Sequence, residues 1–151
     1  MCIRDRFVAG HSAGGYLTSM IGLDKRWLEP YGIDPDTAFV ALIPYSGQVV
    51  THFERRRELG LPDTQPLVDD MAPLSYVRPD CRPMLILSGD REREMLGRYE
   101  ENAYFWRMMR VAGHPDVRIC EFDGFDHGNM PQAGHFVAVR YIREMERRMD
   151  R

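Results

Sequence analysis

Short apolar runs alternate along the chain with longer segments of helical periodicity. Residues 7–9, 39–43 and 83–88 are near-continuous apolar stretches, a pattern typical of strands buried on both faces of a parallel sheet. Residues 117–122 predict a further short strand. Because helical segments separate these runs, the pattern favours an α/β fold with a mostly parallel sheet flanked by helices.

The helical periodicity is clearest directly after the first apolar run, over residues 13–23. Apolar residues recur there at i, i+3, i+4, i+7 and i+8 from Ala13 to Ile21, which places them on one face of a helix. Gly113 is expected to end a later long helix as its C′ residue. The predicted buried stripes are Tyr99, Ala103, Trp106 and Met109 in that long helix, and Val137, Tyr141, Met145 and Met149 in the last one.

Residues 48–82 interrupt this alternation with an insertion. They contain a charged helix at about 52–59, a proline-rich loop and a short helix near 73–77. Connections of that length are uncommon in compact domains unless they carry a function, which makes a plain linker the weaker interpretation.

Composition restricts the classes of protein to consider. The 151 residues, 44% hydrophobic and 28% charged, suit a single globular domain. A formal charge of −3 gives no basic field for nucleic acid, and no apolar stretch has the length of a membrane span. Three cysteines without metal-ligand spacing argue against a disulfide framework, so we expect a reducing, cytoplasmic location.

The pattern that carries chemistry is Gly-His-Ser-Ala-Gly at residues 10–14. A G-x-S-x-G motif between a strand and a helix presents its serine as a nucleophile on a sharp turn. Here the motif lies between the run at 7–9 and the helix at 13–23, so we expect Ser12 to be catalytic. Flanking glycines would permit the crowded turn, and the Ala13 N–H, at the start of the helix, would point toward an oxyanion.

A serine nucleophile needs an acid and a histidine, which come after it along the chain in hydrolases built on this turn. An acidic stretch, residues 90–94, comes directly after the strand at 83–88, and His127 comes in a turn after the strand at 117–122. Both positions lie just past the carboxyl end of a strand, where open α/β sheets place their active sites.

Four other histidines compete with His127 for the role of base. The His11 side chain is expected to point away from Ser12 and to pack or form a local hydrogen bond, whereas His52 could line a pocket; these two are the candidate substrate-binding side chains. His114 is expected in an exposed turn, and His135 in the first turn of the last helix. Asp126, adjacent to His127, is interpreted as capping its turn.

The sequence resembles the α/β-hydrolase fold family, in its esterase/lipase branch. Residues 10–15 read GHSAGG, and residues 70–74 (DMAPL), 87–90 (LSGD) and 126–128 (DHG) match an acetyl-esterase/feruloyl-esterase-like or arylformamidase-like group. This resemblance implies a Ser–acid–His triad that cleaves esters or small amides, with neither an organic cofactor nor a metal. It also implies that the insertion at 48–82 is part of a cap over the site.

The same resemblance selects the acid of the triad. The family's carboxylate usually stands three residues after the glycine that ends the strand, which here is Gly89 and points to Glu92. Most relatives have Asp at this place, although Glu can fill the role. Asp90, one residue after Gly89, is the alternative.

The resemblance further implies an N-terminally truncated domain. In the family this serine turn ends the fifth strand of an eight-stranded sheet, whereas here it begins at residue 10. We therefore expect residues 1–151 to be a single partial domain, its C-terminal half, with residues 1–6 not native. The missing part would supply the second oxyanion N–H.

Three functions remain open from the sequence. The first is a carboxylesterase acting on small acyl esters. The second is an arylformamidase, amidase or peptidase of the same fold, in which His52 or an arginine of residues 48–82 could anchor a charged substrate. The third is a non-catalytic binding protein or an inactive fragment. The expected partner in the first two is a small-molecule ester or amide.

Overall fold

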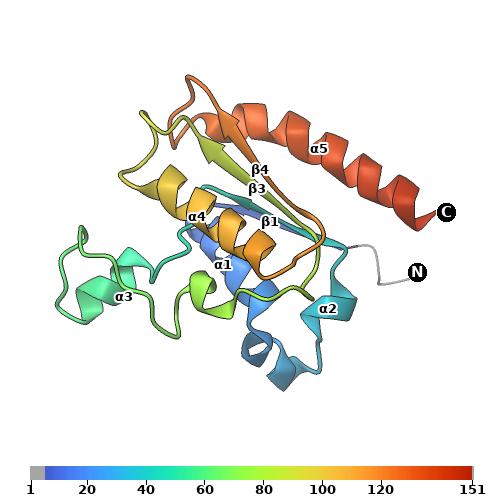
Figure 1. The fold of residues 1–151 in the computed structure, drawn as a ribbon, viewed down its shortest axis with the longest axis horizontal. Coiled ribbons are helices and arrows are strands. Elements are labelled where there is room, and N and C mark those ends of the chain that lie inside the picture. The colour runs from blue at the N-terminus through green and yellow to red at the C-terminus, as the bar shows by residue number, and fades with distance from the viewer. Residues whose placement is uncertain (1–5, 151) are drawn as a thin grey trace.

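The computed structural model describes residues 6–150. The expectation that residues 1–6 are not native concerns residues outside this range, except for Arg6. Figure 1 shows one sheet with helices on either side. In chain order the elements are β1 (Phe7–His11), α1 (Ala13–Leu23), η1 (Lys25–Trp27), η2 (Glu29–Tyr31), α2 (Pro35–Ala38), β2 (Ala41–Tyr45), α3 (Phe53–Glu58), η3 (Pro73–Tyr76), β3 (Met84–Gly89), α4 (Arg98–Val111), β4 (Val117–Phe122) and α5 (Met130–Met149).

The four strands form one parallel sheet in the order β1-β2-β3-β4, which confirms the predicted fold class. Phe7 pairs with Ala41, Leu42 with Met84, and Met84 with Val117. Since all strands run the same way, their carboxyl ends meet at one edge of the sheet. The loops that leave the sheet at this edge carry the residues of the candidate site.

Two helical layers cover the sheet. α1 and α4 lie on one face and α5 on the other (Figure 1). Alternate residues of the central strands feed the two cores: Leu42 and Ile86 pack on the α1/α4 side, while Ile43 and Leu87 pack on the α5 side. All four are fully buried. This two-sided burial explains why β2 and β3 are continuous apolar runs in the sequence.

The first helix has the predicted bounds, but the second strand is displaced. β2 begins at Ala41, two residues later than expected, and continues through Pro44 to Tyr45. Phe39 and Val40 are buried as the chain leaves α2, yet they precede the strand. The apolar run therefore records burial in the core, which starts before strand pairing does.

The buried stripe of α4 lies one residue before the predicted stripe. Met109 belongs to both, but Phe105 and Asn102 are buried in place of Trp106 and Ala103. Asn102 can be buried because its amide donates to two backbone carbonyls, each at 2.8 Å. A polar residue with fixed partners thus occupies a position that periodicity alone assigns to an apolar one.

Two other expectations, one for His114 and one for Met149, are wrong. His114 is buried, because its Nε2 bonds the Cys81 carbonyl and its Nδ1 accepts from the Asp116 N–H. In α5, Tyr141 is buried as predicted, but Met149 is 45% exposed at the end of the helix.

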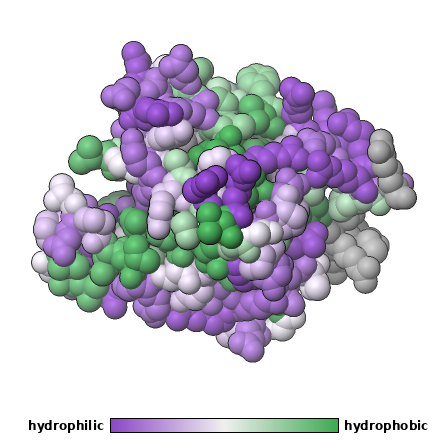
Figure 2. Space-filling view, viewed as in Figure 1, coloured by the Kyte–Doolittle hydropathy of each residue, from purple (hydrophilic) through white to green (hydrophobic). Residues whose placement is uncertain are grey.

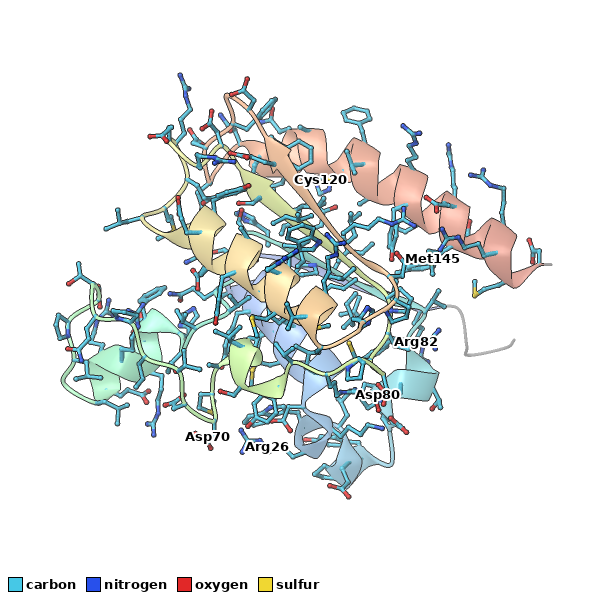
Figure 3. All side chains as sticks on the ribbon, viewed as in Figure 1. Arg26, Asp70, Asp80, Arg82, Cys120 and Met145 are labelled. Carbon is cyan, nitrogen blue, oxygen red and sulfur yellow. The ribbon has the colours of Figure 1, made fainter. Side chains whose placement is uncertain are left out.

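The segment 48–82 contains α3 and the 3₁₀ helix η3 and lies beside α1. Arg26, just after α1, contacts both the carboxylate and the carbonyl of Asp70, and the two are labelled in Figure 3. Among residues 6–150, no helix combines the length and the apolar character needed to cross a membrane.

Candidate active site

Ser12 stands alone between a strand and a helix. β1 ends at His11 and α1 begins at Ala13, and Ser12 between them has φ 57° and ψ −114°. This backbone conformation costs a residue with a Cβ about 1–3 kcal/mol and persists only where the surroundings impose it. Here the Ser12 N–H donates to the Tyr45 carbonyl at 2.9 Å, which ties the turn to the end of β2.

Close packing around this turn requires glycine at two positions. A Cβ on Gly10 would lie 2.4 Å from the carbonyl oxygen of Gly14, and one on Gly15 would lie 2.8 Å from that of Tyr45. A Cβ on Gly14 would meet nothing within 4 Å. The expectation that glycine is sterically required on both sides of Ser12 is therefore correct for Gly10 and wrong for Gly14.

The structure brings Ser12 and His127 together across 115 residues of sequence. His127 Nε2 lies 2.9 Å from Ser12 Oγ, and His127 Nδ1 lies 2.5 Å from Glu94 Oε1. Glu94 is ionised, so Nδ1 carries the proton that it shares with the carboxylate. In the neutral imidazole Nε2 is then free to accept from the Ser12 hydroxyl.

The carboxylate beside His127 belongs to Glu94, and the expectation of Glu92 is wrong. Glu92 is exposed, and its N–H donates to Asp90 Oδ1 at 2.9 Å. Asp90, the alternative, accepts from the Gly124 N–H through Oδ2 at 2.7 Å and so fastens two loops together. Neither of these two carboxylates bonds the imidazole.

A single turn of backbone explains why the carboxylate at His127 comes from Glu94 and not from Glu92, two residues earlier. The N–H groups of Arg93 and Glu94 both donate to the Asp90 carbonyl, so the chain coils once after β3. This turn brings Glu94 back over Gly89, where a Cβ would lie 2.9 Å from Glu94 Oε2. Placing the acid three residues after Gly89 assumes that the loop after β3 is extended and lacks this turn. Two signals were available in the sequence: an aspartate that can begin a turn, and an acid four residues after it.

The Glu94 side chain is buried and held by three further donors. Its Oε2 accepts from Ser46 Oγ at 2.6 Å and from the Gly89 N–H at 3.1 Å, and its Oε1 accepts from the Met95 N–H. Burial acts to raise the pKa of Glu94, but the hydrogen bonds from His127, Ser46 and Met95 outweigh it and lower the pKa to about 2. The carboxylate is therefore ionised throughout the neutral range.

Sequence reasoning missed Ser46, which comes directly after β2. It is fully buried with φ 43°, and its N–H donates to the Leu87 carbonyl at 2.7 Å. Its own carbonyl accepts from Arg98 Nη1 at 2.5 Å, and Arg98 Nε bonds Glu101 at 2.8 Å. Nothing in a Ser-Gly pair after an apolar run distinguishes this arrangement from an ordinary turn.

The His11 side chain contacts the backbone of His127, the candidate base. His11 Nε2 lies 2.9 Å from the His127 carbonyl, to which it must donate, and the two ring centres are 4.7 Å apart. Burial, with the nearby His127, lowers the pKa of His11. Of the two expected roles, packing is confirmed by the contact between the rings, whereas the hydrogen bond is not local, since its partner lies 116 residues away. Asp126 has the expected role, because Oδ1 accepts from the N–H groups of Gly128 and Asn129.

The other candidate residues lie nearby. Ala13 is the first residue of α1, so its N–H has no acceptor within the helix. His52 caps α3, accepting from the Glu54 N–H at 3.3 Å, and its ring centre is 5.1 Å from that of Tyr16. His135 is in the second turn of α5 rather than the first, and its Nδ1 lies 3.3 Å from the Tyr45 hydroxyl.

Within residues 6–150, no group of three or more His, Cys, Asp and Glu is placed to hold a metal ion.

Comparison with solved structures finds the same architecture. An esterase of Thermogutta terrifontis with bound propionate matches at 21% identity with a TM-score of 0.67, and the match covers 92% of this chain and 55% of the esterase. The apo form of Thermogutta terrifontis esterase 2 matches at 24% identity and the same TM-score, over 92% and 55% of the two chains. This chain has the fold of these esterases. It spans about half of their length.

Two sequence comparisons found no relative. No family model matches the sequence, and no curated protein matches it. The likeness to the esterases therefore establishes the fold alone.

Proposed function

We propose that this chain carries the triad of a serine hydrolase that cleaves carboxylic esters of small acyl groups. The observation that carries the proposal is the unbroken series of hydrogen bonds from Ser12 through His127 to Glu94. Nucleophile, base and orienting acid are recognised by this geometry rather than by their positions in the sequence. The strained backbone of Ser12, at the start of α1, adds the feature expected of a presented nucleophile.

The proposed reaction uses these three side chains in turn. His127 Nε2 takes the proton of Ser12 Oγ as that oxygen attacks the ester carbonyl, and the Ala13 N–H stabilises the oxyanion that forms. His127 then gives the proton to the alkoxide leaving group, so an alcohol departs and an acyl-serine remains. Water, deprotonated by His127, attacks the acyl-serine and releases the acid.

Glu94 stays ionised throughout the reaction. It holds the imidazole in the tautomer with a proton on Nδ1 and stabilises the positive charge that His127 acquires. The low pKa of Glu94 fits this role, since a carboxylate that took the proton would no longer offset that charge.

The chain is proposed to be the C-terminal half of an α/β-hydrolase domain. Support comes from the solved esterases, of which 55% is matched by nearly the whole of this chain. Within residues 6–150 the proposed oxyanion donor is the Ala13 N–H, and the second would come from the other half. Removing one such donor costs about 3 kcal/mol in comparable enzymes.

The small acyl group is supported by the same neighbours. Structures of the Thermogutta terrifontis esterase contain propionate or butyrate, and that esterase is phosphoramylated by tabun in another. Short carboxylates are the acids that a short-chain esterase would release, so short acyl esters are the first substrates to test.

The test combines labelling with turnover. A fluorophosphonate probe should label the wild-type chain at Ser12, identified by peptide mass spectrometry, and p-nitrophenyl butyrate should be hydrolysed about 10²- to 10³-fold more slowly than by an enzyme with both oxyanion donors. Ser12→Ala should lose both. Labelling at another residue, or hydrolysis that persists in Ser12→Ala, would overturn the proposal.

A further inference from the structure

Beside the triad lies a pocket of about 460 Å³ that the reaction does not account for. One wall comes from the segment after β2, including Gln48, Phe53 and Arg56, and the other from the start of α4, including Leu96 and Arg98. In Figure 2, hydrophobic residues gather at the lower left, where Figure 1 places α3. The pocket is therefore an apolar recess with a few charged groups, the composition expected of a ligand site.

Both walls of the pocket adjoin residues that hold or follow the triad acid Glu94. Gln48 is two residues after Ser46, the donor to Glu94. Met95, on the opposite wall, is the residue directly after Glu94. A ligand in this pocket would thus lie next to the turn that holds the triad acid.

Arg56 is the unusual member of the lining. It is only 5% exposed, and its Nη1 donates to the carbonyls of Asp63 and Gln65 at 2.7 and 2.6 Å. Its Nε is buried without a hydrogen-bond partner. Over residues 6–150, no carboxylate lies within 4 Å of its guanidinium nitrogens.

Arg98, on the facing wall, is a buried guanidinium whose charge is paired. It is 4% exposed, but it bonds Glu101 at 2.8 Å and donates to the Ser46 carbonyl. Glu101 is occupied in turn by the N–H groups of Val49 and Val50. The remaining acid of the lining, Asp63, faces Arg57 at 3.5 Å and is largely exposed.

These pairings leave one buried positive charge without a counter-charge. Burying an unpaired ion is costly, and an anion that accepts a charge-assisted hydrogen bond recovers part of that cost. Nη1 is committed to backbone carbonyls and Nε is enclosed by protein, so Nη2 is the nitrogen left for a ligand. A carboxylate that accepts from Nη2 would supply the missing counter-charge.

We propose that this pocket binds the carboxylate of the substrate through Arg56, so that the preferred esters are carboxylate-bearing, such as monoesters of dicarboxylic acids. This inference rests on the proposed function, since it names the substrate class of the same site. Arg56 sets specificity and takes no part in bond making or breaking.

The first experiment compares matched esters. The p-nitrophenyl monoesters of succinic, glutaric and adipic acids are set against p-nitrophenyl esters of the unbranched acids with the same acyl chain lengths. Wild type should favour at least one charged ester by kcat/KM, and Arg56→Gln should reduce that preference by about 10- to 100-fold, the worth of a charge-assisted pair. The readout is the ratio of kcat/KM for charged and neutral esters, which a general loss of activity in the variant would leave unchanged.

Two further variants separate recognition from folding. Arg56→Lys keeps a charge, but its one nitrogen cannot serve the backbone carbonyls and a ligand from separate atoms as Nη1 and Nη2 do, so it should fold and still lose most of the preference. Arg55→Gln removes an exposed arginine of the same helix, one that pairs with Glu58, and should leave the preference unchanged. A preference equally reduced in Arg55→Gln would overturn the assignment to Arg56.

The second experiment measures binding without turnover. Thermal unfolding of Ser12→Ala is monitored with monomethyl glutarate and with dimethyl glutarate, and only the charged ester should raise the Tm. The rise should vanish when Arg56→Gln is added. Equal shifts with both esters, or none with either, would overturn the inference. If no ester is hydrolysed by wild type but the charged ester still stabilises Ser12→Ala, the hydrolase proposal fails and the pocket assignment stands.

Discussion

Ser12 and Ser46 occupy equivalent places in the fold and are put to opposite uses. Each comes directly after a parallel strand at the same edge of the sheet, and each has positive φ, 57° and 43° respectively. The Ser12 hydroxyl meets His127 in a partly exposed position, whereas the Ser46 hydroxyl is fully buried on Glu94. The two serines lie at the two ends of one series of hydrogen bonds.

The path of the chain after each serine explains the difference. α1 begins directly after Ser12, so the chain turns away and leaves the hydroxyl open. After Ser46, Gly47 packs against the backbone of Gly15, where a Cβ would lie 2.5 Å from its carbonyl carbon. Arg98 then fixes the Ser46 carbonyl. The same strained turn thus leaves the Ser12 hydroxyl where solvent reaches it, as the proposed reaction requires, and fixes the Ser46 hydroxyl as a donor within the core.

The largest predicted effect is that of removing the Ser12 hydroxyl. Ser12→Ala should lower kcat for p-nitrophenyl butyrate by about 10⁵- to 10⁶-fold, because the nucleophile is lost. Ser19→Ala is the matched control, since it removes a hydroxyl from α1 whose oxygen is buried without a partner. The control should retain activity within about twofold. A comparable loss in both variants would mean that α1 had been disturbed rather than the chemistry.

The next largest effect is predicted for Glu94, the acid that bonds His127. Glu94→Gln should lower kcat by about 10⁴-fold, because an amide can hold the imidazole in the wrong tautomer. Glu92→Gln alters an exposed side chain of the same loop and should change kcat less than twofold. The reverse order of the two losses would restore Glu92 as the acid and contradict the contact between Glu94 and His127.

Ser46→Ala should have a smaller effect. Loss of the hydrogen bond to a charged group is worth about 10- to 100-fold, of which part should show in kcat and part in stability. The pKa of Glu94 should rise, since one of the bonds that lowers it is gone. Ser88→Ala, which removes a buried hydroxyl without a partner from β3, is the control. Equal kcat values for Ser46→Ala and wild type would show that Ser46 does not position the acid.

The smallest predicted effect is on stability in acid. The pKa of Glu94 is about 2 in the folded protein, below the ordinary value of 4.5. Its contribution to stability is therefore complete above about pH 4.5 and is lost as the pH falls toward 2. Tm measured from pH 2 to 6 should fall less steeply in Glu94→Gln than in wild type. Parallel curves for the two proteins would show that Glu94 is not held as described.

The sequence predicts the elements better than it predicts the contacts between them. The strand and helix around Ser12 agree with local patterns, apolar before and periodic after, and α1 has the expected bounds. The α4 stripe does not, because Asn102 is buried through bonds to carbonyls that are distant in sequence or a turn away. Periodicity records apolar burial and cannot register a polar residue whose partners come from another loop.

The same limit applies to the candidate site. Ser12 and His127 belong to motifs with recognisable local sequence, and the structure brings them together. The acid depends on how the backbone coils between residues 90 and 94, which several charged residues in a row leave undetermined. The contact of Ser46 with Glu94 depends on the tertiary fold, and the burial of Arg56 depends on how residues 56–65 coil; no short motif encodes either.

The order of the sheet has a consequence for how the site comes into being during synthesis. Because the strands lie side by side in chain order, each emerging strand can add to the edge of those already made. Ser12 belongs to the first strand–helix unit, Glu94 comes after the third strand, and His127 comes after the fourth. The nascent chain would thus carry the proposed nucleophile without a base until His127, 115 residues later, has been made and has packed beside it.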